Sequence, residues 1–227
     1  MAAHDVKILR TILDGTRNQL DPDMKDAEFF GFFAAQQILR GYSIDPEEIK
    51  SGIVGQPSTK KSSGSSSDSV ERPGTDGGID SIYLFVNGTL IRDRNQIRAL
   101  KKLRGDILFE VIIIQSKGEP GFQLAPIIRM GNTCESILDI TKKKSDFKEK
   151  YNEDLIEAIA LFRAAYTALL LSSPTISVRC FYAGFRDTDK LDSNITDKAQ
   201  ELENKIPGIL TNLTLWPFGA TNPFFFL

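Results

Sequence analysis

Polar residues interrupt the apolar strand-like segments of this chain at two places, and both places are strand ends. Asp80 comes directly before the apolar run 81–86, while Gln115 and Lys117 close an isoleucine-rich run that begins at residue 107. Such a near-continuous apolar run is typical of a central strand that is covered on both faces. Polar groups there are costly to desolvate unless they bind one another or a ligand. We therefore expect a carboxylate, an amide and an ammonium group at the ends of neighbouring core strands.

The composition argues against several classes of catalytic site. His4 is the only histidine among the 227 residues, which speaks against serine–histidine and cysteine–histidine hydrolases and against histidine-rich zinc sites. Cys134 and Cys180 have no metal-ligand partner spacing, so we expect two buried free thiols in a reducing compartment. The net charge of −2, from 28 basic and 30 acidic residues, gives no global electrostatic argument for a nucleic-acid partner.

The remaining pattern predicts a single α/β domain over residues 1–227, with a mixed central sheet flanked by helices. Asn87-Gly88 between the first two strands predicts a hairpin turn. The expected helices are 6–20, 23–40 (capped by Asp21 or Asp23), 45–49, 95–103, 152–171 and 193–210, with 124–140 mixed and helical only in its later part. The expected strands are 81–86, 89–92, 107–115 and 176–182.

Two segments do not fit the predicted core. The serine-rich segment 57–73 has no periodicity and is expected to be a flexible loop. The tail 211–227 is apolar, so it either docks as a last strand or is the cut end of a longer protein. The first residues lack a signal-peptide pattern, and the apolar stretch 158–171 is interrupted by Arg163, so we expect no membrane span and a cytoplasmic protein.

The polar strand ends meet the requirements of a metal-dependent phosphodiesterase. A divalent cation neutralises charge on the phosphate and lowers the pKa of an attacking water, and Mg²⁺ prefers a few hard oxygen ligands. Asp80 is the expected first ligand, followed by the side-chain oxygen of Gln115 and the backbone carbonyl of Ser116. Lys117 lies on the same strand face as Gln115, because strand side chains alternate, and its ammonium would orient the water or stabilise negative charge.

Further positions join this hypothesis, although each also has a purely structural explanation. Glu28 lies in an otherwise apolar helix and is a further candidate oxygen ligand, or else a first-turn acid that interacts favourably with the helix dipole. Gly77 and Gly78 leave room where the backbone or a phosphate passes closely, with Asp76 as a further substrate contact, or else the three residues form an ordinary turn. Arg129 has a structural explanation: the aliphatic part of its side chain lies in apolar surroundings while its guanidinium reaches water.

The combined pattern resembles the PD-(D/E)XK nuclease superfamily. Asp-Gly-Gly-Ile-Asp at residues 76–80, a hairpin, and Ile-Ile-Gln-Ser-Lys at 113–117 resemble its Mrr-like form with Gln-x-Lys. Within that form, residues 29–117 are similar to the nuclease-like N-terminal part of abortive-infection phage-resistance (AIPR) proteins. By this resemblance Asp80 matches the first acid, Gln115 the second position and Lys117 the lysine.

The same resemblance implies a fold, a cofactor and a partner. It matches Glu28 with the helix acid of the superfamily and implies a restriction-endonuclease-like core. It further implies a nuclease that depends on Mg²⁺ or Mn²⁺, acts on nucleic acid (DNA above all), and serves bacterial defence against phage. A homo-oligomer or a partner protein is compatible with such a role. The sequence departs from the usual pattern at Gln115, which replaces an acid and so reduces the negative charge of the site.

Two other functions remain open from the sequence. The amide at Gln115 also fits a nuclease-like fold that binds nucleic acid or assembles with a partner without turnover. A nucleotide cradle at Gly77-Gly78 is disfavoured, because a strand follows the glycines where a dinucleotide-binding fold requires a helix.

Overall fold

The computed structural model describes residues 3–20, 23–54, 75–118, 121–184, 192–205 and 210–217. The predicted loop 57–73 and the end of the tail, 218–227, lie outside these residues. Within the described part the chain forms a mixed five-stranded sheet in the order β2-β1-β3-β4-β5. The strands are β1 (Ser81–Val86), β2 (Thr89–Leu90), β3 (Leu108–Lys117), β4 (Thr175–Gly184) and β5 (Leu210–Pro217). β1 is antiparallel to β2 and β3, whereas β3, β4 and β5 are parallel.

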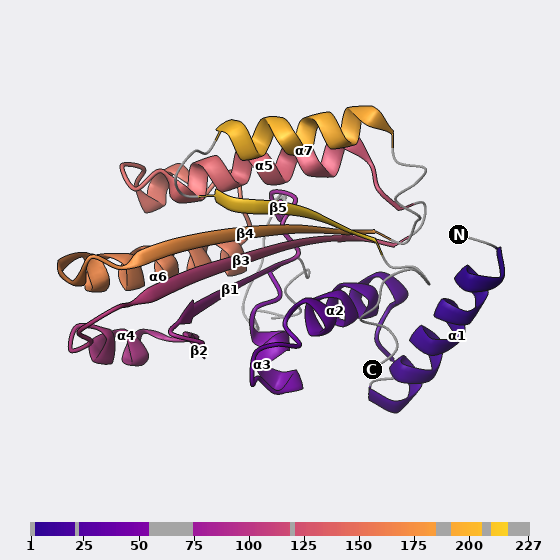
Figure 1. Cartoon of the computed structure of the whole chain (residues 1–227), viewed down its shortest axis with the longest axis horizontal. Coiled ribbons are helices and arrows are strands. Elements are labelled where there is room, and N and C mark those ends of the chain that lie inside the picture. Colours follow the sequence, from indigo (N-terminus) through magenta and orange to yellow (C-terminus); the bar gives the residue numbers. More distant parts are fainter. Residues whose placement is uncertain are drawn as a thin grey trace, which may run out of the picture.

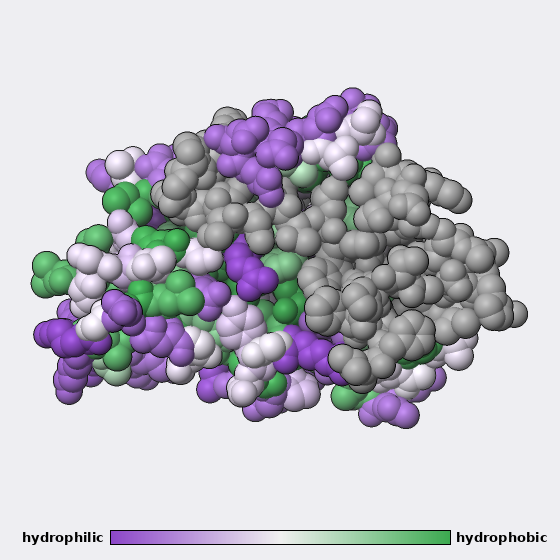
Figure 2. Space-filling model, viewed as in Figure 1, coloured by the Kyte–Doolittle hydropathy of each residue, from purple (hydrophilic) through white to green (hydrophobic). Residues whose placement is uncertain are grey.

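Helices cover both faces of this sheet, as the sequence predicts for an α/β domain. They are α1 (Ala3–Leu20), α2 (Asp26–Ile38), α3 (Pro46–Ser51), α4 (Arg94–Leu100), α5 (Leu124–Leu138), α6 (Glu153–Leu169) and α7 (Ser193–Lys205), with short 3-10 turns at Lys144–Asp146 and Leu170–Ser172. α2 and α3 lie on one side of the sheet and α5 and α7 on the other (Figure 1). In α7 the residues Ile195, Ala199 and Leu202 are buried, while hydrophilic side chains cover its outer surface (Figure 2).

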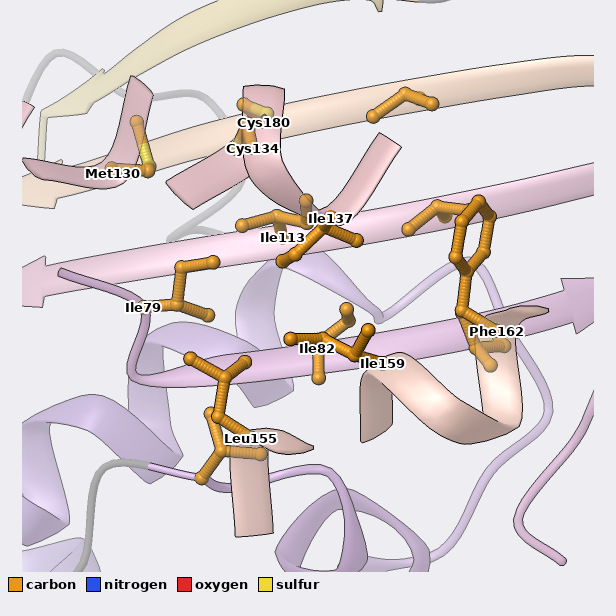
Figure 3. Packing of buried hydrophobic residues seen from close by; sticks show 14 of the residues in the cluster. Ile79, Ile82, Ile113, Met130, Cys134, Ile137, Leu155, Ile159, Phe162 and Cys180 are labelled. Atoms are coloured by element: carbon orange, nitrogen blue, oxygen red, sulfur yellow. Dashed lines mark hydrogen bonds between the residues drawn. The ribbon is translucent and has the colours of Figure 1, made fainter. Parts of the chain in front are cut away.

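The side chains of β3 alternate between two apolar clusters. Val111 and Ile113 belong to the cluster with α5 and α6, and Ile112 and Ile114 belong to the cluster with α2; none of the four is exposed. Figure 3 shows Ile113 among the side chains that α5 and α6 contribute. Continuing the alternation to the strand end directs Gln115 and Lys117 toward the α5 face and Ser116 toward α2.

β1 forms a hairpin with β2, and its antiparallel pairing with β3 on the other side sets which residues meet at that strand end. Asn87 and Gly88 both have positive φ, 48° and 77°, as a tight two-residue hairpin turn requires. β2 ends at Leu90, two residues earlier than expected from the sequence. Because β1 returns antiparallel to β3, with Ser81 opposite Ile114, the residue before β1 lies beside the residues that end β3.

Two expectations about helix starts are wrong. α5 is helical from Leu124 onward, although the sequence predicted a helix only later; Pro126 falls in the first turn, where the missing N–H has no intrahelical partner in any case. The N-cap of α2 is Lys25 and makes no side-chain cap hydrogen bond, in place of Asp21 or Asp23. The burial of phenylalanines such as Phe32 along α2 stabilises this helix more than a cap would.

One helix, Glu153–Ser172, is long and apolar enough to cross a membrane by length and composition. The sequence had argued against such a span because Arg163 interrupts it. Leu155, Ile159 and Phe162 on the inner face are buried in the core (Figure 3). Core helices that pack against a sheet have this same apolar composition, so the finding is weak evidence for a membrane span.

Cys134 and Cys180 are free and buried, as predicted. They are distant in the sequence, yet their Sγ atoms lie 3.7 Å apart, with Cys134 on α5 and Cys180 on β4 (Figure 3). This contact with Cys134, together with burial, raises the pKa of the Cys180 thiol. The Cys180 thiol is therefore a weak nucleophile in the folded protein.

Candidate functional site

The predicted carboxylate and amide meet at one edge of the sheet. The Asp80 Oδ2 atom accepts three hydrogen bonds, from the Ser116 backbone N–H at 2.6 Å, the Ser116 hydroxyl at 2.5 Å and the Gln115 Nε2 atom at 3.1 Å. Within the described residues no hydrogen bond reaches the second oxygen, Oδ1. The carboxylate is thus held in one orientation by the end of β3, with one oxygen available to a ligand.

The orientation of the Gln115 amide follows from its partners. Its nitrogen donates to Asp80 Oδ2 and, at 2.8 Å, to the Ser116 backbone carbonyl. Both partners accept hydrogen bonds, so the nitrogen and not the oxygen must occupy this position. The side-chain oxygen of Gln115 therefore points elsewhere. It remains a possible oxygen ligand, and the second lone pair of the Ser116 carbonyl is another.

Burial dominates the electrostatics of Asp80. The pKa of this carboxyl is raised from 3.8 to about 6, chiefly by burial. The two Ser116 hydrogen bonds oppose this shift; among the weaker influences, the charge of Asp76 raises the pKa and the charge of Lys117 lowers it. Asp76 and Lys117 are therefore both close enough to act on the site. A half-buried carboxylate whose ionised form is disfavoured gains from a cation beside it. This donor set of hard oxygens fits Mg²⁺ or Mn²⁺.

The turn before Asp80 is built on two glycines that pack against α5. The Gly78 N–H donates to Asp76 Oδ1 at 2.8 Å, and the Thr133 hydroxyl donates to the Gly77 carbonyl at 2.7 Å. Gly77 and Gly78 have φ of 63° and 76°. A Cβ at Gly78 would lie 2.8 Å from the Met130 backbone nitrogen. Positive φ and close packing thus account for both glycines, against the Thr133 and Tyr151 side chains at Gly77 and against the α5 backbone at Gly78; contact of residues 76–78 with a phosphate remains a prediction.

We expect Gly78→Ala to lower the free energy of unfolding by about 2–4 kcal/mol, since it combines backbone strain with a backbone collision. Urea denaturation followed by circular dichroism would measure the loss. Gly88→Ala is the matched control, because Gly88 also has positive φ but has no atom within 4 Å of an added Cβ. The control should lose only about 1–2 kcal/mol. Equal losses in the two variants would contradict the packing role of Gly78.

Glu28 lies in the first turn of α2 and is half-buried. α2 covers the sheet face toward which Ser116 points, opposite to the face of Gln115 and Lys117. Gly31, one helical turn after Glu28, packs against Ser116: a Cβ on Gly31 would lie 3.2 Å from the Ser116 hydroxyl oxygen. The helix therefore passes close to the strand end. A metal-binding role of Glu28 remains a prediction, beside its explanation as a first-turn acid.

Two side-chain groups of this site were not found by sequence reasoning. The hydroxyl of Ser116, for which only the backbone carbonyl was considered, is a direct partner of Asp80. Tyr182 lies opposite Gln115 in the parallel register of β3 and β4, and its hydroxyl is hydrogen-bonded to the backbone N–H and carbonyl of Gln123. Ser116 could have been inferred from its place between Gln115 and Lys117. Tyr182 has no local signal, because only the strand register brings it there.

In the part of the chain that the structure describes, no group of three or more His, Cys, Asp or Glu side chains is arranged to hold a metal ion. A cation at this site would instead depend on Asp80 together with amide and carbonyl oxygens. No protein-family model, curated protein or solved structure matches the chain.

Proposed function

We propose that this protein is a metal-dependent nuclease that hydrolyses phosphodiester bonds, with DNA as its substrate and a restriction-endonuclease-like core. The observation that carries this proposal is the hydrogen-bonded group of Asp80, Gln115 and Ser116 at the strand end next to Lys117. The hairpin, the antiparallel pairing of β1 with β3, and the parallel β3–β4 pair support it. The role in phage defence rests on the sequence resemblance alone, and a cytoplasmic location remains a separate prediction from the sequence.

The residues have separate tasks in this mechanism. Asp80, the Gln115 side-chain oxygen and the Ser116 carbonyl would hold Mg²⁺ or Mn²⁺, with Glu28 as a further candidate ligand. The cation supplies charge neutralisation at the phosphate and a lower pKa for the attacking water. Ser116 keeps the Asp80 carboxylate in place through its N–H and hydroxyl, so that the ligand geometry is set before substrate arrives.

Lys117 acts on the reacting atoms. Its ammonium lies on the strand face of Gln115 and lowers the pKa of Asp80, so its positive charge is close to the proposed metal ligands. There it orients the water for attack on phosphorus and stabilises the negative charge that grows on the phosphate oxygens. A strand places this charge more rigidly than a loop would, which favours catalysis by a fixed electrostatic environment.

The proposal is tested by incubating plasmid DNA with the purified protein in Mg²⁺ or Mn²⁺ and, separately, in EDTA. We expect cleavage that EDTA abolishes and that Lys117→Met lowers by about 100- to 1,000-fold, because one stabilising charge is lost. Lys101→Met is the matched control: Lys101 is exposed and follows α4, well away from the end of β3. Cleavage that persists in EDTA would contradict the metal dependence, and cleavage that Lys117→Met leaves unchanged would contradict the catalytic role of Lys117.

A second candidate function is a nuclease-like module that binds nucleic acid or a partner without turnover. The Gln115 amide favours it, because both of its donated hydrogen bonds occupy acceptors that a metal would otherwise use. This candidate predicts binding that persists in EDTA and survives Lys117→Ala, with no cleavage of DNA or RNA in any divalent metal.

A further inference from the structure

Arg129 of α5 lies beside the turn that leads to Asp80, and the mechanism above does not use it. A Cβ on Gly78, two residues before Asp80, would lie 2.9 Å from the Arg129 Cβ. Arg129 is exposed. Within the described ranges of the chain its guanidinium makes no hydrogen bond or ion pair that would neutralise it. A solvated surface arginine would need no explanation elsewhere, but here the position is next to the candidate site.

The direction of the helix brings the Arg129 side chain toward that site. Side chains on a helix tilt toward its N-terminus, so Arg129 extends toward the N-terminal end of α5, where Gln123 is the N-cap. The Gln123 N–H donates to the Tyr182 hydroxyl at 2.8 Å, and that hydroxyl donates to the Gln123 carbonyl at 3.2 Å. Tyr182 in turn lies opposite Gln115 in the sheet. The start of α5 is therefore fixed at the strand end that carries the candidate site.

The electrostatics of Tyr182 support the same placement. Burial raises the pKa of its hydroxyl and the Gln123 backbone hydrogen bond lowers it; the negative charge of Asp80 raises it further, and the positive charge of Arg129 lowers it. Both charges thus act on one hydroxyl group. The guanidinium and the carboxylate are therefore both near Tyr182.

We propose that Arg129 binds a backbone phosphate of the nucleic-acid strand at the Asp80 site. This inference rests on the proposed nuclease function for its substrate class. The carboxylates of Asp76 and Asp80 repel a polyanion, and a net charge of −2 provides no general attraction, so local cations must supply it. Lys117 provides one on the strand side, and Arg129 provides a second on the α5 side. A guanidinium suits this task because it can donate two parallel hydrogen bonds to one phosphate.

The test is the binding of a fluorescently labelled DNA oligonucleotide by the full chain, with Ca²⁺ in place of Mg²⁺, measured by anisotropy over a range of salt concentrations. We expect Arg129→Ala to weaken binding about tenfold and to lower the slope of log affinity against log salt by about 1, the effect of one lost phosphate contact. Arg129→Lys should restore the slope, because it keeps the charge. Arg98→Ala is the matched control, an exposed arginine of α4 at the other end of the sheet (Figure 1).

The outcomes separate this inference from the nuclease proposal. Arg129→Ala binding with wild-type affinity and slope overturns the phosphate contact, even if cleavage depends on Lys117. Loss of binding in Arg129→Ala but not in Arg98→Ala supports the contact, even if the wild type cleaves nothing, in which case only the nuclease proposal fails. A wild type that binds no DNA overturns the inference as well. Equal melting temperatures of the variants would exclude a folding defect as the cause.

Discussion

Asp80→Asn is expected to reduce Mg²⁺-dependent cleavage by about 1,000-fold or more. The substitution keeps the shape of the side chain and an oxygen that can accept the Ser116 hydrogen bonds, but it removes the only full charge among the three proposed oxygen ligands. Metal-assisted charge stabilisation is worth several kcal/mol, and each ~1.4 kcal/mol changes a rate tenfold. Initial rates on supercoiled plasmid over a series of Mg²⁺ concentrations would measure the loss.

The matched control for this loss is Asp106→Asn. Asp106 is exposed in the loop before β3, roughly 30 Å from the end of that strand at ~3.3 Å per residue. The Asp106→Asn variant should cleave DNA at the wild-type rate. Asp80→Asn activity within tenfold of wild type, or an equal defect in Asp106→Asn, would show that the carboxylate of Asp80 is not a metal ligand.

The same Asp80→Asn substitution is expected to stabilise the fold at neutral and alkaline pH. Burial raises the pKa of Asp80 to about 6, against 3.8 for the unperturbed group. Between these values the native state binds more protons than the unfolded state, so stability falls as the pH rises from about 4 to about 6. Above that window the ionised carboxylate lowers the free energy of unfolding by its full amount, at most about 3 kcal/mol at ~1.36 kcal/mol per pKa unit. Partial exposure of Asp80 makes this an upper value, because solvent screens the charge.

Urea denaturation of wild type and Asp80→Asn between pH 4 and pH 8 in EDTA would measure this difference. We expect the two free energies of unfolding to be nearly equal at pH 4 and the variant to be more stable at pH 8. Asp106→Asn, in which the exposed group has no burial cost, should show no such pH-dependent gain. If Asp80→Asn is less stable than wild type at pH 8, the carboxylate is stabilised by its surroundings and the raised pKa is wrong.

Together the two results would identify a site that lowers stability for the sake of function. A carboxylate that is costly to ionise in the free protein becomes favourable once a cation lies beside it. Wild-type protein should therefore gain stability from Mg²⁺ at pH 8, and Asp80→Asn should gain much less.

The sequence by itself predicted most of the elements and the residues that were candidates for chemistry. The hydrophobic run of β3 and the Asn-Gly turn after β1 are local signals, because backbone conformation and burial on both faces follow from residue type and spacing. The strand 81–86 was predicted with the bounds that β1 has. Asp80 and Gln115 were expected together because each stands at the end of a predicted core strand.

Only the tertiary structure decided which distant residues join the site. The parallel register of β4 brings Tyr182 to Gln115, and the packing of α5 against the Gly77-Gly78 turn brings Arg129 near Asp80. No periodicity in the sequence contains this information, because a parallel register and a helix position depend on how side chains from separate segments fill one core. The start of α5 was missed for the same reason: its inner face is defined by the sheet on which it packs.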